Sequence, residues 1–477
     1  MKLHQPFVRL IGSAAVLVLV ACGDSGKPNV APDDISASTP GAPEFVSDVP
    51  QVTEAMLQPD FWEQRLSDDR VRMSAQEIHA FNAVNLAGDP YLHRLDEFPQ
   101  VMPKAAVLAL IDTVSMPASS PRVFVDGSAV EEADYSQLEA TVQRVEIPEE
   151  VTVRWGLVVE RASMRSYPTR TRVLKNTGDS DLDRFQETGV FPGQQLAILH
   201  ESADGEWWFA VNYHYAAWVP KSAVALGDRA AIHDWAQQSL RLTVSGAQVR
   251  TNFNPEDART SEVVLDMGVS LPLLSAAQVG HNVHGQNPFA SYIVSLPVRD
   301  ANGKLAFEPT LIGRGKDVRV GHLPYKPSVV LRQAFKFLGE RYGWGHDYNG
   351  RDCTGFVGEV YKSFGILMPR NSGQQGKSAF APTQTFAPDD HEARVKALSS
   401  LSVGDLIYIP GHVMMYIGEV DGEPFVIHDV TGLSYYTQDE SYYRGTLSGV
   451  SVTPLMPLQL NGEKRYIDGI YAIKSII

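Results

Sequence analysis

The feature that most constrains this chain is the stretch YGWGHDYNGRDCTGF at residues 342–356, a glycine-rich turn that runs directly into Cys353. After the cysteine, apolar side chains recur at the spacing of one helix face: Phe356, Val357, Val360, Tyr361 and Phe364. This pattern predicts a helix that begins at Cys353. Backbone N–H groups and the helix dipole favour a thiolate there, so a pKa below the usual cysteine value of about 8.5 is expected. The alternative is a small residue buried in the core.

The chain contains only two cysteines, and they lie in regions of different character. Cys22 follows a basic start and an apolar run at residues 10–21, which is too short to span a bilayer but suits a signal peptide. The sequence LVAC at residues 19–22 resembles a bacterial lipoprotein box, which implies cleavage before Cys22 and lipid on its sulfur. The alternative is a plain signal peptide with an incidental cysteine. With Cys22 lipidated, Cys353 has no intramolecular partner in an oxidising compartment, which favours a functional thiol.

Length and composition predict several domains rather than one core. A chain of 477 residues corresponds to about three or four domains. Its net charge of −15 disfavours nucleic-acid binding, which requires a basic surface. Six regions are expected: a signal peptide at 1–21, a flexible tether at 22–49, a mostly helical and irregular clamp at 50–147, a first all-β barrel at 148–226, a second at 230–322, and an α+β domain at 323–477.

Local signals support the regions between the tether and the last domain. Ser74 and Glu77 form a capping box before Ile78, Phe81 and Val84, which recur at helical spacing. Short strands separated by Gly, Pro and Asp turns fill residues 148–226. There, WW at 207–208 and YAAWV at 215–219 resemble the closing strands of a bacterial SH3-type barrel. The alternating run SYIVSL at 291–296 indicates a second, more divergent barrel.

Two histidines in the last domain can serve a cysteine nucleophile, which needs a base and a group that orients the base. Strands are expected at 406–409, 413–417 and 425–427, with His412 before the second and His428 after the third. The histidines stand directly opposite each other if the hairpin apex is at Val420. A turn centred on Asp421-Gly422 would instead place His428 opposite Met415, on the wrong face, unless a bulge compensates.

The remaining histidines are weaker candidates. His281 and His284 lie in a Gly/Asn-rich loop without a third ligand, so no metal site and no cofactor are expected. His346 lies in the glycine turn and can line a cleft, although nothing requires it.

Four sequence blocks of the last domain, in this order, resemble the signature of NlpC-type cysteine peptidases, papain-like enzymes that act on bacterial cell-wall peptides. The blocks are YGWG at 342–345, DCTGF at 352–356, PRNS at 369–372 and PGHV at 410–413. Thr354 and Asn371 depart from the usual serine and aspartate. The clamp and two barrels resemble one subgroup of these enzymes.

The resemblance implies roles for particular residues. Cys353 would be the nucleophile, His412 the general base and His428 the orienting residue, with Tyr342 on the oxyanion side. Asp352 and Ser372 match positions that hold the substrate amine, where a carboxylate can pair with an ammonium. Tyr215 of the first barrel, by its place before Trp218, is expected to close this pocket.

The function expected from the resemblance is a cysteine endopeptidase that cuts murein peptides with a free N-terminal L-alanine after γ-D-glutamate, at the bond to the diamino acid. The alternatives are a hydrolase or amidase of intact peptidoglycan and a non-catalytic wall-binding lipoprotein. The expected location is the periplasm, with a lipid anchor at Cys22. Gly23 lacks the inner-membrane aspartate signal, which favours the outer membrane. A monomer is expected, with no nucleic-acid partner.

Overall fold

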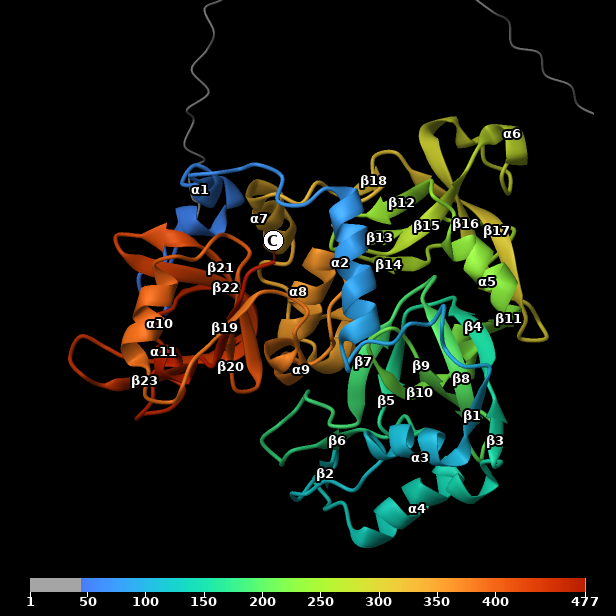
Figure 1. The fold of residues 1–477 in the computed structure, drawn as a ribbon, viewed down its shortest axis with the longest axis horizontal. Helices are drawn as coiled ribbons and strands as arrows, with labels where there is room; N and C mark the ends of the chain where they lie inside the picture. Colours follow the sequence, from blue (N-terminus) through green and yellow to red (C-terminus); the bar gives the residue numbers. More distant parts are fainter. Residues whose placement is uncertain (1–43, 477) are drawn as a thin grey trace, which may run out of the picture. The chain divides into compact units, whose positions relative to one another are not determined.

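The computed structural model describes residues 44–476, and residues Ser47–Ile477 form one compact unit (Figure 1). The expected signal peptide, Cys22 and most of the tether lie outside the described residues. Within the described part, every helix is too short or too polar to cross a membrane.

The N-terminal segment is helical and irregular, as predicted. Its elements are η1 (Glu54–Leu57), α1 (Pro59–Glu63), α2 (Ala75–Gly88), β1 (Val101–Pro103), α3 (Lys104–Asp112), β2 (Val123–Phe124), α4 (Glu132–Val142) and η2 (Arg144–Glu146). The capping box of Ser74 and Glu77 is confirmed at the start of α2. Ile78 is buried, but Val84 is 72% exposed, so its assignment to the apolar face was wrong.

This N-terminal segment contacts both the C-terminal domain and the first barrel. Trp62 of α1 packs against Phe425, and Asn82 of α2 hydrogen-bonds the backbone of Gly365 and Leu367, all in the C-terminal domain. In Figure 1, α2 lies between that domain, in orange and red, and the β-rich regions in green. Farther along, Ser115 accepts a hydrogen bond from the indole of Trp218 in the first barrel. The segment therefore braces the C-terminal domain and the first barrel.

The first β-rich region is a seven-stranded antiparallel sheet in the order β11-β4-β8-β9-β10-β5-β7. Its elements are β4 (Arg154–Val158), β5 (Ala162–Arg165), β7 (Gln186–Val190), β8 (Gln195–Glu201), β9 (Trp207–Val211), β10 (Ala216–Pro220), η3 (Lys221–Ala223) and β11 (Val224–Gly227). Short β3 (Glu150–Thr152) pairs with β1, and β6 (Val173–Leu174) pairs with β2. Phe209 and Trp218 are fully buried, as expected for barrel-core aromatics.

The second β-rich region contains a five-stranded sheet in the order β17-β16-β15-β12-β18 and the pair β13-β14. Its elements are α5 (Arg229–Ala236), β12 (Arg241–Val244), β13 (Gln248–Arg250), β14 (Val264–Asp266), β15 (Ser270–Leu274), α6 (Ala276–Val279), η4 (Pro288–Ala290), β16 (Ser291–Arg299), β17 (Leu305–Gly313) and β18 (Val318–Val320). The region is not purely β as expected, because α5 opens it and buries Ile232 and Trp235 on one face. Its apolar core is continuous with that of the first barrel.

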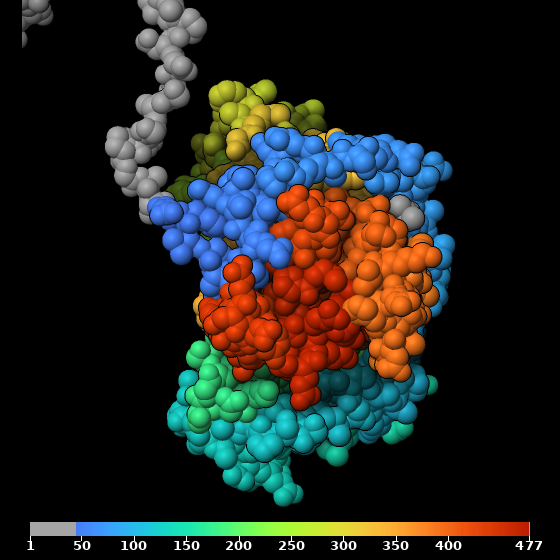
Figure 2. Space-filling view, turned by 90° about the vertical axis from the view of Figure 1, so that its left-hand side faces the viewer, coloured from blue at the N-terminus to red at the C-terminus, as the bar shows by residue number. Residues whose placement is uncertain are grey.

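The C-terminal domain is α+β. Its elements are α7 (Pro327–Phe335), η5 (Trp344–Asn349), α8 (Cys353–Lys362), α9 (Ser372–Lys377), β19 (Thr383–Thr385), α10 (His391–Leu398), β20 (Leu406–Ile409), β21 (His412–Val420), β22 (Glu423–Tyr436), β23 (Tyr442–Pro454), α11 (Tyr466–Gly469) and β24 (Ala472–Lys474). The six strands follow the order β19-β24-β20-β21-β22-β23. One core joins the sheet to α7 and α8, and another joins it to α10 and α11. Figure 2 shows this domain beside the blue N-terminal segment.

The β21–β22 hairpin does not have its apex at Val420. Val420 pairs with Glu423, so the turn is Asp421-Gly422, and both turn residues have the positive φ that this tight turn requires. A bulge at Ile417 then shifts the register by one residue, and Met415 pairs with Ile427. The directly opposed arrangement was therefore wrong, and the alternative with a compensating bulge is the one observed.

Candidate active site

Cys353 is the first residue of α8, as the sequence predicts. The predicted apolar face of this helix is buried to 1% exposure or less, which fixes the helix against the sheet. The cysteine is 7% exposed and is the free thiol of the described residues. Its N-cap residue, Asp352, accepts a hydrogen bond from the backbone N–H of Gly355 at 2.8 Å.

The expectation of a lowered cysteine pKa was wrong. Burial raises the pKa of the Cys353 thiol to about 12, and the neighbouring Asp352 carboxylate adds to this shift. The backbone N–H of Val413 acts in the opposite direction but is outweighed. The N-cap adds to the effect of burial, because the Asp352 carboxylate places a negative charge beside the sulfur. Cys353 therefore rests as a neutral thiol.

His412 and His428 meet despite the unexpected register. Since Met415 pairs with Ile427, the next pair outward is Met414 and His428. His412 lies two residues from Met414 on the same face, so the two imidazoles approach diagonally. His412 Nε2 is 2.8 Å from His428 Nδ1, and His428 Nε2 is 3.0 Å from the Thr453 hydroxyl.

Two arrangements of the ring protons satisfy these contacts. In one, His428 Nε2–H donates to Thr453 and His428 Nδ1 accepts from His412 Nε2–H, which leaves Nδ1 of His412 as a free lone pair; in the other, the Thr453 hydroxyl donates and each direction is reversed. Burial lowers the pKa of His412 to about 4, so this imidazole is neutral near pH 7. Thr453 on β23 was not found from the sequence, because no local motif marks it.

Tyr342 and His346 occupy the glycine turn but have different surroundings. Tyr342 is 9% exposed, and burial raises its pKa, so the phenol remains a hydrogen-bond donor. His346 is absent from the lining of the cleft that contains His412 and instead lines a separate small cavity of about 30 Å³. It is 4% exposed, and its Nε2 is 3.2 Å from Glu359 Oε1. His346 Nδ1 accepts from the backbone N–H of Gly189 in the first barrel, so this histidine joins the barrel to α8.

Asp352 is already fully bonded in the structure. Its two oxygens accept hydrogen bonds from the Arg370 guanidinium, the backbone N–H groups of Gly345 and Gly355, and the Thr354 hydroxyl. Burial alone would raise the pKa of Asp352, but the Arg370 charge and these hydrogen bonds outweigh it and lower the pKa. No oxygen of this carboxylate is left without a partner, so its expected role of holding an amine stays a prediction.

A second carboxylate lies beside Tyr215. The Tyr215 hydroxyl donates a hydrogen bond to Glu187 of β7, and the side chain of Asn371 contacts the same hydroxyl. Burial raises the pKa of Glu187, while Tyr215 and Arg370 act against that shift. Ser372 follows Asn371 as the first residue of α9. Tyr215 of the first barrel thus contacts the residue before Ser372. Glu187 was missed because only the tertiary fold brings it to this place.

A cleft of about 480 Å³ begins at the histidine side of the site. Its lining includes Tyr342, His412 and Asp429 at one end and the outer parts of β22 and β23 at the other. Asp429 is fully buried, and neither of its oxygens has a hydrogen-bond partner among the described residues. Burial, with Asp352 and Glu340, raises the pKa of Asp429 to about 9, so it rests as a neutral acid.

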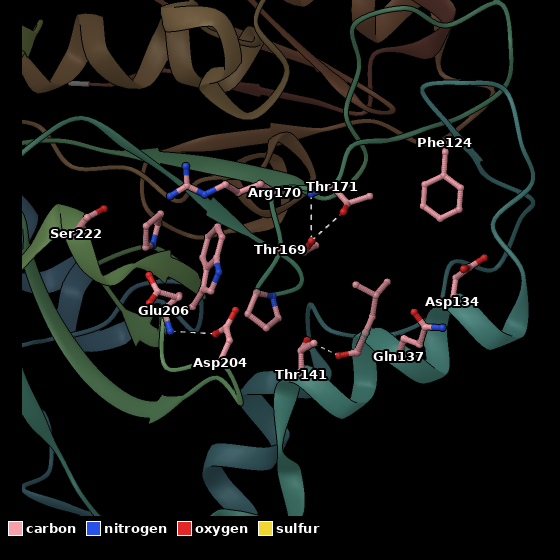
Figure 3. A pocket seen from close by; sticks show the side chains of 14 residues that line it. Phe124, Asp134, Gln137, Thr141, Thr169, Arg170, Thr171, Asp204, Glu206 and Ser222 are labelled. Atoms are coloured by element: carbon pink, nitrogen blue, oxygen red, sulfur yellow. Dashed lines mark hydrogen bonds between the residues drawn. The ribbon is translucent and has the colours of Figure 1, made fainter.

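A larger cavity of about 610 Å³ lies away from Cys353 (Figure 3). Side chains of α4, including Asp134, Gln137 and Thr141, face Thr169 and Asp204 of the first barrel across it. Its lining holds neither a cysteine nor a histidine, so it lacks the groups of nucleophilic catalysis.

Family models match two parts of the chain. Residues 339–452 match the NlpC/P60 family, and residues 172–220 match the SH3 domain (SH3b1 type). The second β-rich region is matched by neither of these two models, so its assignment as an SH3-type barrel stays a prediction.

Similar proteins agree with these matches. The chain is 26% identical over 258 residues to the gamma-D-glutamyl-L-lysine dipeptidyl-peptidase of Bacillus cereus (strain ATCC 10987 / NRS 248), covering 49% of this chain and 65% of that protein. It is 28% identical over 131 residues to the bifunctional muramidase/DL-endopeptidase CwlT of Bacillus subtilis (strain 168), covering 25% of this chain and 34% of that protein. The chain therefore spans less than two thirds of either relative.

A solved structure extends the likeness to most of the chain. An NlpC/P60 endopeptidase from Photobacterium damselae subsp. piscicida superposes with a TM-score of 0.68 at 17% identity, covering 87% of this chain and 96% of that one. At this identity the likeness establishes a common fold.

Proposed function

Because residues 339–452 belong to the NlpC/P60 family of cysteine peptidases, we propose that this protein hydrolyses the γ-D-glutamyl–diaminoacyl bond of murein peptides. The observation that carries the proposal is the 2.8 Å contact between His412 Nε2 and His428 Nδ1, beside a cysteine at a helix N-terminus. The intact cysteine and histidines argue against a non-catalytic wall-binding lipoprotein.

The reaction begins from a neutral thiol and a neutral imidazole. Cys353 Sγ attacks the γ-carbonyl carbon while His412 Nδ1 takes the thiol proton, and the Tyr342 hydroxyl donates to the developing oxyanion. His412 then gives its proton to the leaving amine, and the C–N bond breaks to leave a thioester on Cys353. Water, deprotonated by His412, attacks the thioester and releases the γ-D-glutamyl product and the thiol.

We propose that the substrate has a free N-terminal L-alanine. Glu187 and Tyr215 of the first barrel lie near Asn371 and Ser372, and an ammonium there would pair with the Glu187 carboxylate. In this proposal the first barrel supplies one wall of the substrate pocket, which explains why the peptidase domain is joined to a barrel. It also disfavours hydrolysis of intact peptidoglycan, where this amine is blocked.

The test compares hydrolysis of L-Ala-γ-D-Glu-meso-diaminopimelate, its N-acetyl form and intact sacculi. The wild type is expected to cut the free tripeptide at least about 30-fold faster than the acetylated one, because acetylation removes the charge that Glu187 binds. Cys353→Ala should cut none. Equal rates on the free and acetylated peptides would overturn the amine site, and release of fragments from sacculi alone would favour the hydrolase of intact wall.

We also propose a periplasmic, monomeric protein held by lipid at Cys22, at the outer rather than the inner membrane. The support is the LVAC sequence at residues 19–22 and Gly23 after it. Metabolic labelling with a radioactive fatty acid, compared with Cys22→Ser, tests the anchor, and equal labelling of both would overturn it.

A further inference from the structure

The cleft on the histidine side receives the leaving part of the substrate. His412 protonates the leaving amine, so that amine must lie within hydrogen-bonding reach of His412. His412 lines the cleft of about 480 Å³, whereas Glu187 and Tyr215 lie on the side of the first barrel. The residue after the scissile bond therefore enters the cleft and extends along β22 and β23.

Arg444 is the one arginine or lysine in the lining of this cleft. It lies on β23 opposite Ser434, another lining residue. Its side chain is exposed and makes neither an ion pair nor a hydrogen bond with any residue that the structure describes. Asp429, the one carboxylate of the lining, is buried and rests as a neutral acid, so it does not cancel the Arg444 charge.

The charge and place of Arg444 select an anion at the far end of the leaving residue. The net charge of −15 repels anions from the protein as a whole, whereas an unpaired guanidinium in a cleft attracts a carboxylate locally. Five residues of strand separate Asp429 from Ser434, at most roughly 17 Å at about 3.3 Å per residue, since a bulge between Val430 and Gly432 shortens the path. A long side chain that ends in a carboxylate, met by the long arginine side chain, suits this distance.

We propose that Arg444 binds the side-chain carboxylate of the leaving diamino acid and so makes the enzyme select a diamino dicarboxylic acid over lysine. This inference rests on the proposed function. Diaminopimelate and lysine differ only by that carboxylate, so a comparison of peptides that contain one or the other reports recognition of the carboxylate alone. Hydrogen bonds from a guanidinium to a carboxylate are stronger than neutral ones, although exposure weakens the pair.

The experiment measures kcat/KM for L-Ala-γ-D-Glu-meso-diaminopimelate and for L-Ala-γ-D-Glu-L-Lys. The wild type is expected to prefer the diaminopimelate peptide about tenfold, and the preference should shrink as salt rises from 0.05 to about 0.5 M. In Arg444→Gln the ratio should fall close to one, and Arg444→Lys should retain part of it. Arg319→Gln is the control, because it removes an equal charge from an exposed site outside the cleft and should keep the wild-type ratio.

The outcomes separate the two proposals. A wild-type ratio near one, or an unchanged ratio in Arg444→Gln, overturns the carboxylate site while hydrolysis itself still supports the proposed function. Failure of the wild type to cut either peptide overturns both proposals. Circular dichroism of each variant confirms that Arg444→Gln is folded, which an exposed arginine without intramolecular partners should permit.

Discussion

At the scale of single residues, the site combines groups that burial keeps neutral. The Cys353 thiol, the His412 imidazole and the Asp429 carboxyl all have pKa values shifted toward the uncharged form. The N-terminus of α8 does not overcome this effect for Cys353, because burial dominates and the Asp352 carboxylate, which accepts a hydrogen bond from the N–H of Gly355, adds a negative charge. In the proposed mechanism, the sulfur therefore becomes charged only when His412 takes its proton during attack.

Alkylation should report the raised pKa of Cys353 directly. Because the thiol is protonated at neutral pH, its rate with iodoacetamide should rise about tenfold per unit from pH 6 to 9, without a plateau near 8.5. Cys353→Ser is the control, because it reports any reaction outside Cys353, and its rate is subtracted. A plateau below pH 8 would mean that the helix N-terminus dominates after all.

Asp429 should make the folded state less stable as the pH rises. Its pKa is about 9 in the fold and about 3.9 in the unfolded chain, so between these values only the folded state carries the proton. This group therefore lowers the free energy of unfolding by up to about 1.4 kcal/mol per pH unit on going from pH 5 to 8. Asp429→Asn should flatten that slope in urea unfolding, whereas Asp421→Asn in the exposed turn should not. Equal slopes in wild type and Asp429→Asn would contradict the assignment.

At the scale of elements, the site depends on one tight turn and one irregular hairpin. The turn at residues 343–350 positions Tyr342 and Cys353, and within it backbone atoms pack directly against other backbone atoms. A Cβ at Gly343 would lie 2.3 Å from the carbonyl oxygen of Asp347. Because this oxygen belongs to the backbone, it cannot move aside as the end of a flexible side chain could.

Two alanine substitutions should therefore have opposite effects. Gly343→Ala should lower the free energy of unfolding by about 1–3 kcal/mol and reduce activity, because the turn must move. Gly358→Ala lies inside α8, where the new Cβ meets no atom within 4 Å beyond its own helix backbone and chain neighbours, and should stabilise by about 0.5–1 kcal/mol. Both changes are measured by urea unfolding. A Gly343→Ala enzyme as stable as the wild type would show that the turn is adaptable.

Local sequence patterns predicted where the helices and strands of the C-terminal domain lie better than how its strands pair. The apolar period after Cys353 located α8, and the strand around Leu406–Ile409 matches β20, because both signals reside in neighbouring residues. The sequence left two hairpin registers open, because the bulge at Ile417 that decides between them has no local signal. The bulge lies beside a long-range contact: a Cβ at Gly418 would lie 3.0 Å from the Trp62 ring. Glu187 and Thr453 could not be found, since only the tertiary fold brings them to the site.

At the scale of the whole molecule, Arg351 ties α8, the helix that begins at Cys353, to the second β-rich region. Its guanidinium is fully buried and bonds Asp266 of β14 at 2.7 Å, Glu359 of α8 at 2.8 Å and Glu340 at 2.7 Å. Arg351 stands two residues before Cys353, so the second region helps to hold the start of α8.

Removal of this arginine should be costly. Arg351→Met leaves Asp266 and Glu359 buried with one fewer cation, which typically lowers the free energy of unfolding by about 3–5 kcal/mol. Arg341→Met is the control, because the Arg341 side chain is 65% exposed and its loss should cost less than about 0.5 kcal/mol. Similar urea midpoints for the two variants would show that the buried network contributes little.

The bulge at Ile417 also determines how this hairpin can vary among related chains. Two residues inserted together at the Asp421-Gly422 turn would lengthen both strands equally and leave His412 and His428 on the same face. A single residue inserted within one strand, rather than in the turn, would turn His428 away unless a bulge were gained or lost with it. Insertions within the paired strands are thus tolerated in matched pairs, and a search that demands a fixed interval between the histidines would overlook functional relatives.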